Sequence, residues 1–338
     1  MNVLLRPLLI SIFFFPMLLS AQLSYTVDHM LLKLNDIDLA SGDVSASRVN
    51  FDNRFAEITN IASDDELTHI ALTEKPILRD YAVAALIERQ SPELLRIFTD
   101  YTMHDEPFVK RDGNRTYQTS SAAEFYKNIA KQKERLVRKA YYERTASKEQ
   151  IAELRVLFGA DFDTNWTMAQ TDSLLQAFTS VAMANDAMSA GTMSTIFRSN
   201  EYKSDNYERV KFFAEKFQTP EILATLASFK RPEDVPFLLN NFENSLIAIT
   251  RFPHAAFLPK LQMELLNHYQ DAAFQTAVAG YQNADAAKML SQMVDKLAKE
   301  NPKKPDEDRA EKLLQLYNII ESVNSPLYDV LLKRMQKF

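Results

Sequence analysis

The fold is decided by residues 78–101, which read LRDYAVAALIERQSPELLRIFTDY. Apolar residues recur at the spacing of one helix face as far as Leu86, and the same spacing resumes at Leu94. Between them stands Ser91-Pro92-Glu93. Proline is favoured at the start of a helix, because its missing N–H would have no partner there. The stretch therefore predicts a helix, a sharp corner and a second helix packed against the first.

The same pattern occurs a second time in the chain. The corner segment Gln90-Ser91-Pro92-Glu93-Leu94-Leu95 matches Gln218-Thr219-Pro220-Glu221-Ile222-Leu223, and the apolar positions on both sides correspond as well. Similarity at a fixed offset is the sequence signature of repeat architectures. In the first copy we expect the side chains of the two helices to meet at Ala82, Ala85 and Leu86 on one side and Leu94, Leu95 and Phe98 on the other.

The residues Leu78-Arg79-x-x-Ala82-x-x-Ala85-Leu86, followed by Pro92-Glu93-Leu94-Leu95, resemble a HEAT repeat running into the next one. The resemblance extends over residues 76–101 and 206–298, and Phe213 departs from it where a small residue is expected. It implies an α-solenoid, in which antiparallel helix pairs stack into a superhelix with a long concave face. Members of this family are mostly binding scaffolds, so it implies no catalytic residue.

Other helix starts are marked by a hydroxyl residue followed at the third place by Glu or Gln, the pattern of a capping box. Such pairs are Ser121 and Glu124, Ser147 and Gln150, and Thr167 and Gln170. Apolar residues at helical spacing form two stripes, one of Phe125, Ile129, Leu136 and Ala140 and the other of Ala286, Leu290, Met293, Val294 and Leu297. Counting caps and such stripes predicts roughly sixteen to eighteen short helices. One exception is Asp112-Gly113 between runs containing Val, Thr and Tyr, which predicts a β-hairpin over residues 107–118. The expected fold is all-α, an α-solenoid with one small β-hairpin insertion.

The first residues have the organisation of a Sec-type signal peptide. Arg6 precedes an apolar run from Leu8 to Leu19, and the small residues Ser20-Ala21 follow. The run is shorter than the ~20 residues that span a bilayer, so we expect cleavage after Ala21 rather than an uncleaved anchor. The mature protein is then periplasmic or extracellular, without stable membrane insertion. The expected segments are the signal peptide 1–21, an N-terminal helical segment 22–75, a HEAT-like pair with the hairpin 76–146, a helical middle segment 147–203 and C-terminal HEAT-like repeats 204–338.

Composition excludes several classes of enzyme. The chain has only 5 Gly and no Cys. Its closest glycines, Gly159 and Gly191, are too far apart for a phosphate-binding loop, and thiolate chemistry is excluded. The low Gly content also argues against folds that need frequent left-handed turns, such as β-sandwiches and Gly-hinged barrels. We expect no catalytic residue, no cofactor and no metal ligand.

One segment resembles a calcium loop in its spacing. It contains Asp161-x-Asp163-x-Asn165 and ends at Asp172. Trp166 stands where the loop requires Gly, and Asp172 replaces the bidentate Glu. Loop carboxylates between two helices are the simpler interpretation.

The charge distribution indicates a candidate binding surface. The whole chain has a formal net charge of -6, yet Lys110–Lys148 contains eleven basic residues and only four acidic ones. The alternative interpretation is an ordinary solvated helix face. Stacking aromatic residues are not interleaved with these cations, so nucleic acid is not the expected partner. The candidate binding residues are Lys110, Arg111 and Arg115 on the hairpin, and Lys127, Lys131, Arg135 and Arg138 along the following helix.

These observations favour an exported, non-catalytic scaffold that binds another envelope or extracellular protein, one with an acidic surface. The alternative is an all-α secreted enzyme that cleaves polysaccharide with paired carboxylates. The chain has a single Trp, Trp166, which is few for stacking sugars.

Overall fold

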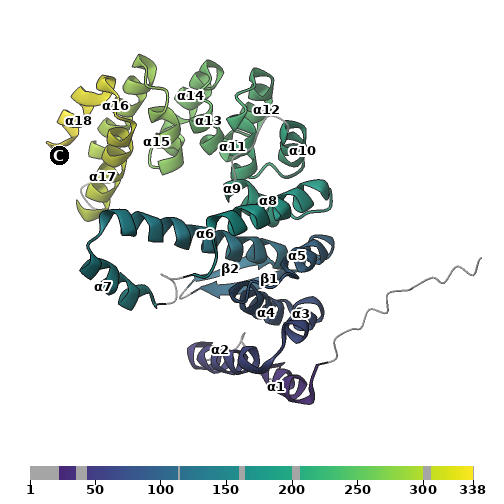
Figure 1. The fold of residues 1–338 in the computed structure, drawn as a ribbon. Coiled ribbons are helices and arrows are strands. Elements are labelled where there is room, and N and C mark those ends of the chain that lie inside the picture. The colour runs from purple at the N-terminus through teal and green to yellow at the C-terminus, as the bar shows by residue number, and fades with distance from the viewer. Residues whose placement is uncertain are drawn as a thin grey trace, which may run out of the picture. The chain divides into compact units, whose positions relative to one another are not determined.

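A computed structural model describes residues 23–35, 44–112, 115–159, 164–199, 206–299 and 306–337. Within these ranges the chain forms eighteen α-helices and one two-stranded antiparallel sheet (Figure 1). The predicted all-α class with a single hairpin is confirmed, and the helix number agrees with the expectation. The predicted signal peptide lies outside the described residues.

The chain divides into two compact units, Met1–Ile97 and Phe98–Phe338. In the first, α2 contacts α1 and α4, and α3 packs along α4. The rings of Phe51, Phe55 and Tyr81 cluster between α2 and α4. Helix α3 begins at a capping box of Ser63 and Glu66 that the sequence analysis did not identify. The helices of this unit are α1 (Tyr25–Asn35), α2 (Val44–Ile61), α3 (Asp64–Thr73) and α4 (Pro76–Glu88), and α5 (Leu94–Met103) crosses the boundary.

The second unit contains the hairpin and the remaining helices. Its elements are β1 (Pro107–Asp112), β2 (Arg115–Ser120), α6 (Ser121–Thr145), α7 (Lys148–Phe158), α8 (Met168–Ala184), α9 (Ala190–Ser199), α10 (Tyr207–Phe217), α11 (Pro220–Ser228), α12 (Val235–Asn240), α13 (Leu246–Arg251), α14 (Leu258–His268), α15 (Ala272–Ala279), α16 (Ala284–Lys299), α17 (Asp306–Val323) and α18 (Asp329–Met335).

Helices of the second unit contact one another in two series. Contacts run from α9 to α11, α13, α15 and α17 in one series, and from α14 to α16 and α18 in the other (Figure 1). Consecutive helices link the series, because α15 contacts α14 and α16, and α16 contacts α17. The predicted stripe of α16 is fully buried between them, at Ala286, Leu290, Met293, Val294 and Leu297.

Left-handed residues form the corners between helices. Gln90 (φ 55°) and Gln218 (φ 52°) occupy equivalent positions in the two similar segments, and Lys230, Gln282 and Asn324 have the same backbone. Proline follows two residues later in four of the five cases. The residue before a proline is forced out of the helical region, so the helix must end just ahead of it. A left-handed residue is the usual way to end it. Gln, Lys and Asn adopt the left-handed backbone here in place of Gly, so these helix corners form in a chain that has few glycines.

The predicted hairpin is confirmed and is slightly longer than expected. Pairing runs from Pro107 opposite Ser120 to Asp112 opposite Arg115. Because β2 continues to Ser120, that serine caps α6, and its Oγ accepts a hydrogen bond from the N–H of Ala123. The predicted capping box of Ser121 and Glu124 was therefore wrong by one residue. The boxes at Ser147 and Thr167 are confirmed.

Candidate interaction surface

Stacked aromatic rings hold the first half of α6 in place. Phe98 of α5 and Phe178 of α8 stack with ring centroids 3.9 Å apart, and the ring of Phe125 meets both edge-on. All three side chains are buried. Such aromatic pairs contribute about 0.5–1.5 kcal/mol each beyond the area that they bury. The start of α6 is thus a fixed platform for the hairpin.

A polar cluster joins the hairpin to two helix ends. The Asp105 carboxylate lies just before β1, and its Oδ1 accepts a hydrogen bond from the N–H of Ala122 at 3.1 Å. Its Oδ2 accepts from the hydroxyls of Ser189 at 2.7 Å and Thr192 at 2.8 Å. The Thr192 hydroxyl also lies 2.9 Å from that of Ser120. One carboxylate therefore accepts hydrogen bonds at the N-termini of both α6 and α9, where a negative charge is favourable.

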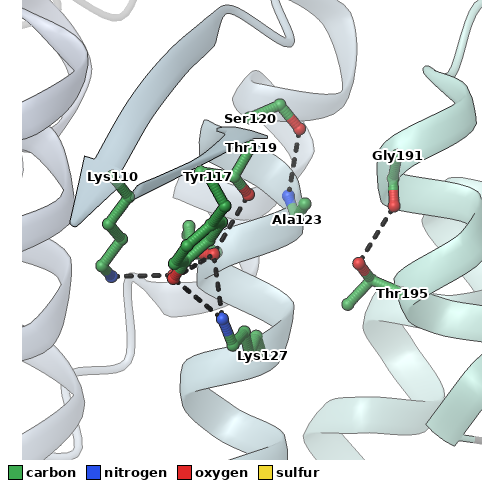
Figure 2. A network of polar contacts seen from close by, with 9 residues as sticks. Lys110, Tyr117, Thr119, Ser120, Ala123, Lys127, Gly191 and Thr195 are labelled. Atoms are coloured by element: carbon green, nitrogen blue, oxygen red, sulfur yellow. Dashed lines mark hydrogen bonds and ion pairs between the residues drawn. The ribbon is translucent and has the colours of Figure 1, made fainter. Parts of the chain in front are cut away.

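Side chains of the hairpin also hydrogen-bond to a buried carboxylate on α6 (Figure 2). Glu124, only 2% exposed, receives the Lys110 ammonium at 2.7 Å and the Thr119 hydroxyl at 3.0 Å. The Lys127 ammonium lies 3.4 Å from the same carboxylate and donates to the Tyr117 hydroxyl at 2.9 Å. Three strand residues, Lys110, Tyr117 and Thr119, and one residue a turn along α6 thus surround a single negative charge.

The pKa values of this cluster reflect two competing effects. Burial raises the pKa of the Glu124 carboxyl, but the hydrogen bond and charge of Lys110, with the charge of Lys127, outweigh it and leave that pKa below its usual value. Burial likewise lowers the pKa of Lys127, while Tyr117 and Glu124 reverse the effect and leave it raised. Glu124 is consequently an ionised member of a buried ion pair at neutral pH.

The structure brings two of the predicted binding residues together and spreads others along α6. Lys110 and Lys127 meet at Glu124, whose single negative charge offsets one of their two positive charges. The backbone of Arg111 pairs with Thr116 and that of Arg115 with Asp112, and their side chains lie outside the described residues. Farther along α6, Lys131 and Arg135 are half-buried and Arg138 is exposed.

Beyond Gln132, the second half of α6 and all of α7 form an extension, residues 133–158, that we call the arm. Not one described residue from 133 to 157 is buried. Of the predicted α6 stripe, Phe125 and Ile129 are buried, whereas Leu136 and Ala140 are not. At the base of the arm, the Thr164 hydroxyl donates a hydrogen bond to the Gln132 side chain at 2.8 Å. The residues that flank the two ends of the arm therefore lie close together.

The arm carries large apolar side chains in solvent. Val156 is 85% exposed and Leu157 75%, while Val137 and Tyr141 are each 54% exposed. The arm also has seven basic residues and four acidic ones, in a chain that is acidic as a whole. The cations of the arm are predicted from the sequence, but the exposure of its apolar side chains is not, because an apolar periodicity ordinarily indicates a buried face.

A second buried polar pair lies between α10 and α12. The Tyr207 hydroxyl donates to Asp234 Oδ1 at 2.8 Å, and the Arg231 guanidinium stacks 3.5 Å from the Tyr207 ring centroid. Burial and the neighbouring Asp234 raise the pKa of Tyr207 to about 12, and burial raises that of Asp234. The pair joins α10 to the corner at Lys230 and is enclosed by the fold.

The described residues contain no group of three or more His, Cys, Asp or Glu side chains that could hold a metal ion. Asp161 and Asp163 of the calcium-like segment lie outside them. Across the same part of the chain, no helix combines the length and apolarity needed to cross a membrane. Comparison of the chain with protein-family models, with curated proteins and with solved structures gives no match.

Proposed function

We propose that this protein is an exported, non-catalytic scaffold that binds another envelope or extracellular protein through an α-solenoid surface. The two series of contacting helices, α9 to α17 and α14 to α18, support a solenoid, because stacked helix pairs contact mainly their neighbours. The equivalent corners at Gln90 and Gln218 support a repeat origin. HEAT-like proteins use such continuous surfaces for recognition.

The observation that carries the proposal is the arm. A helical extension with no buried side chain among its described residues 133–157 gains little stability from the fold. It nevertheless exposes Val156, Leu157, Val137 and Tyr141. Val137 and Tyr141 lie one turn apart on α6, and Val156 and Leu157 are neighbours on α7, so each helix of the arm exposes an apolar pair. Exposed apolar surface that is rimmed by polar residues is typical of sites that bind another molecule. A partner protein with apolar side chains inside an acidic rim would cover these residues and match the excess of cations on the arm.

Photo-crosslinking in the native envelope tests the proposal. The mature protein, residues 22–338, would carry a photoreactive amino acid at Val137 on the arm. We expect one dominant cross-linked protein. The double substitution Val156→Ser and Leu157→Ser should remove the cross-link, since burying each of these side chains contributes about 1.5–3 kcal/mol.

The chain offers a closely matched control. Val330, 80% exposed, and Leu327, 55% exposed, lie at the end of the chain, and Val330→Ser with Leu327→Ser should leave the cross-link intact. Absence of a specific cross-linked protein, or equal loss in both double variants, would contradict the proposal. Release of reducing sugar from polysaccharides by the mature protein would instead support the alternative enzyme.

A further inference from the structure

A groove runs between α14 and α16 in the second unit. It has a volume of about 640 Å³ and is lined by Gln262, Met263, Leu265, Leu266, Gln292, Asp295, Lys296 and Lys299. Leu265 is buried at its floor, whereas Met263 is 63% and Leu266 64% exposed on the α14 side. Met263 and Leu266 stand three residues apart on one helix, so they share a face. The groove thus has an apolar wall that the fold does not cover.

The other wall is positively charged. Lys296 and Lys299 lie on α16, and Lys296 is held over the Tyr269 ring, 4.4 Å from its centroid. The one carboxylate in the lining, Asp295, is bound by Arg334 of α18. Gln262 and Gln292 hydrogen-bond to each other across the groove at 3.4 Å. The groove therefore pairs exposed apolar side chains with two ammonium groups whose charge the lining itself does not offset.

We infer that this groove binds an acidic amphipathic helix of a partner protein. Such a helix would place apolar side chains one turn apart against Met263 and Leu266, the usual way in which a helix occupies a groove. Its Glu or Asp side chains would lie against Lys296 and Lys299. Methionine suits this role, because its flexible side chain adapts to the side chain that it meets. The inference deepens the proposed scaffold function by assigning a second surface and the chemistry of its ligand.

Three synthetic peptides test the inference by fluorescence anisotropy with the mature protein. Each has about sixteen residues, long enough for a stable amphipathic helix, and the same stripe of Leu. They differ only in carrying Glu, Gln or Lys at the polar positions. We expect the Glu peptide to bind most tightly and the Lys peptide least, with a difference that shrinks as ionic strength rises.

Two sets of variants locate the binding. Leu266→Ser should lower the affinity for the Glu peptide at least about tenfold, which is the loss expected when one buried Leu contact is removed. Leu314→Ser is the matched control, because Leu314 is 59% exposed on α17 outside the groove, and it should change nothing. Lys296→Glu combined with Lys299→Glu should reverse the preference toward the Lys peptide, and cooperative thermal unfolding checks that this variant is still folded.

Several outcomes would overturn the inference. They are no binding of the Glu peptide, equal binding of the Glu and Lys peptides, or full binding by the Leu266→Ser variant. Sedimentation showing a dimer that Leu266→Ser abolishes would assign the groove to a second copy instead. The Val156→Ser and Leu157→Ser variant should bind the peptide normally, so failure of the envelope cross-link and failure of the groove remain distinguishable.

Discussion

Gln218 ends α10 in the left-handed region, with φ 52°, and the next two residues, Thr219 and Pro220, open α11. A side chain in this conformation costs roughly 1–2 kcal/mol, because Cβ crowds the following carbonyl. Glycine avoids the crowding but loses about 0.4–1 kcal/mol through the greater freedom of the unfolded chain.

The first prediction is therefore that Gln218→Gly raises the free energy of unfolding by about 0.5 kcal/mol, while Gln218→Val lowers it by about 1 kcal/mol or more. Urea unfolding of both variants checks this. The control is Gln176, exposed within α8, where Gly should cost about 1 kcal/mol. The same loss at Gln218 would show that the corner is not left-handed.

Glu124 gives a prediction about pH. Its folded-state pKa is lowered, so its contribution to stability is present above the ordinary carboxyl pKa and is lost as pH falls through the lowered value. Glu124→Gln should cost about 2–3 kcal/mol at pH 7, because two ammonium groups lose a hydrogen-bonded carboxylate. It should also flatten the decline of stability toward acid pH, measured by urea unfolding at a series of pH values.

Glu153→Gln is the comparison for Glu124→Gln. Glu153 is exposed on the arm, so its substitution should stay within about 0.5 kcal/mol at every pH. If the two variants have the same pH profile, the Glu124 ion pair does not stabilise the fold.

Single residues also mark the limit of what the sequence predicts. The cations Lys110 and Lys127 were identified by their charge, but their partner was assigned to a capping box on the basis of local spacing. Either Ser120 or Ser121 could cap α6 according to the local sequence. The pairing of the hairpin, which extends β2 to Ser120, determines that Ser120 is the cap. Because Ser120 is the N-cap of α6, Glu124 lies one position beyond the place that a capping box requires. Its carboxylate contacts the hairpin instead.

At the scale of elements, the hairpin, α6 and α9 meet at Thr192. Its side chain is fully buried, and its hydroxyl connects Asp105 to Ser120. Thr192→Val keeps the shape but leaves these two partners incompletely paired. We predict a loss of about 1–3 kcal/mol and faster hydrogen exchange in β1 and β2.

Thr195 on the same helix provides the control for Thr192→Val. Its hydroxyl bonds only to the Gly191 carbonyl one turn earlier (Figure 2), so Thr195→Val should change little. Hairpin exchange that is unaffected by Thr192→Val would show that the Thr192 hydroxyl does not hold the hairpin in place.

Elements whose signals are local were the easiest to predict. The hairpin follows from Asp112-Gly113, and the starts of α7 and α8 follow from their capping boxes. The extent of burial along α6 was not predictable, because periodicity shows which face is apolar and not where the neighbouring helices end. Phe125 and Ile129 meet partners, whereas Leu136 and Ala140 lie beyond them.

For the whole molecule, stability and recognition are expected to reside in different parts of the chain. The aromatic platform, the Glu124 cluster and α16 contain buried side chains. The arm contains none among its described residues. The exposed ion pair of Lys133 with Asp172 at its base contributes little, since such pairs contribute about 0–1 kcal/mol each.

The last prediction separates the two roles by removing the arm. Gln132 and Thr164 are joined by a 2.8 Å hydrogen bond, so a short Gly-Ser linker can replace residues 134–162 without strain. We expect the free energy of unfolding to change by less than about 1 kcal/mol, the helical circular dichroism to fall in proportion to the residues removed, and capture of the envelope partner to be lost. Deleting α16, which buries six apolar side chains, should instead abolish cooperative unfolding. An armless protein that unfolds as easily as the α16 deletion would show that the arm is part of the core, and its exposed valines and leucine would then no longer indicate a binding surface.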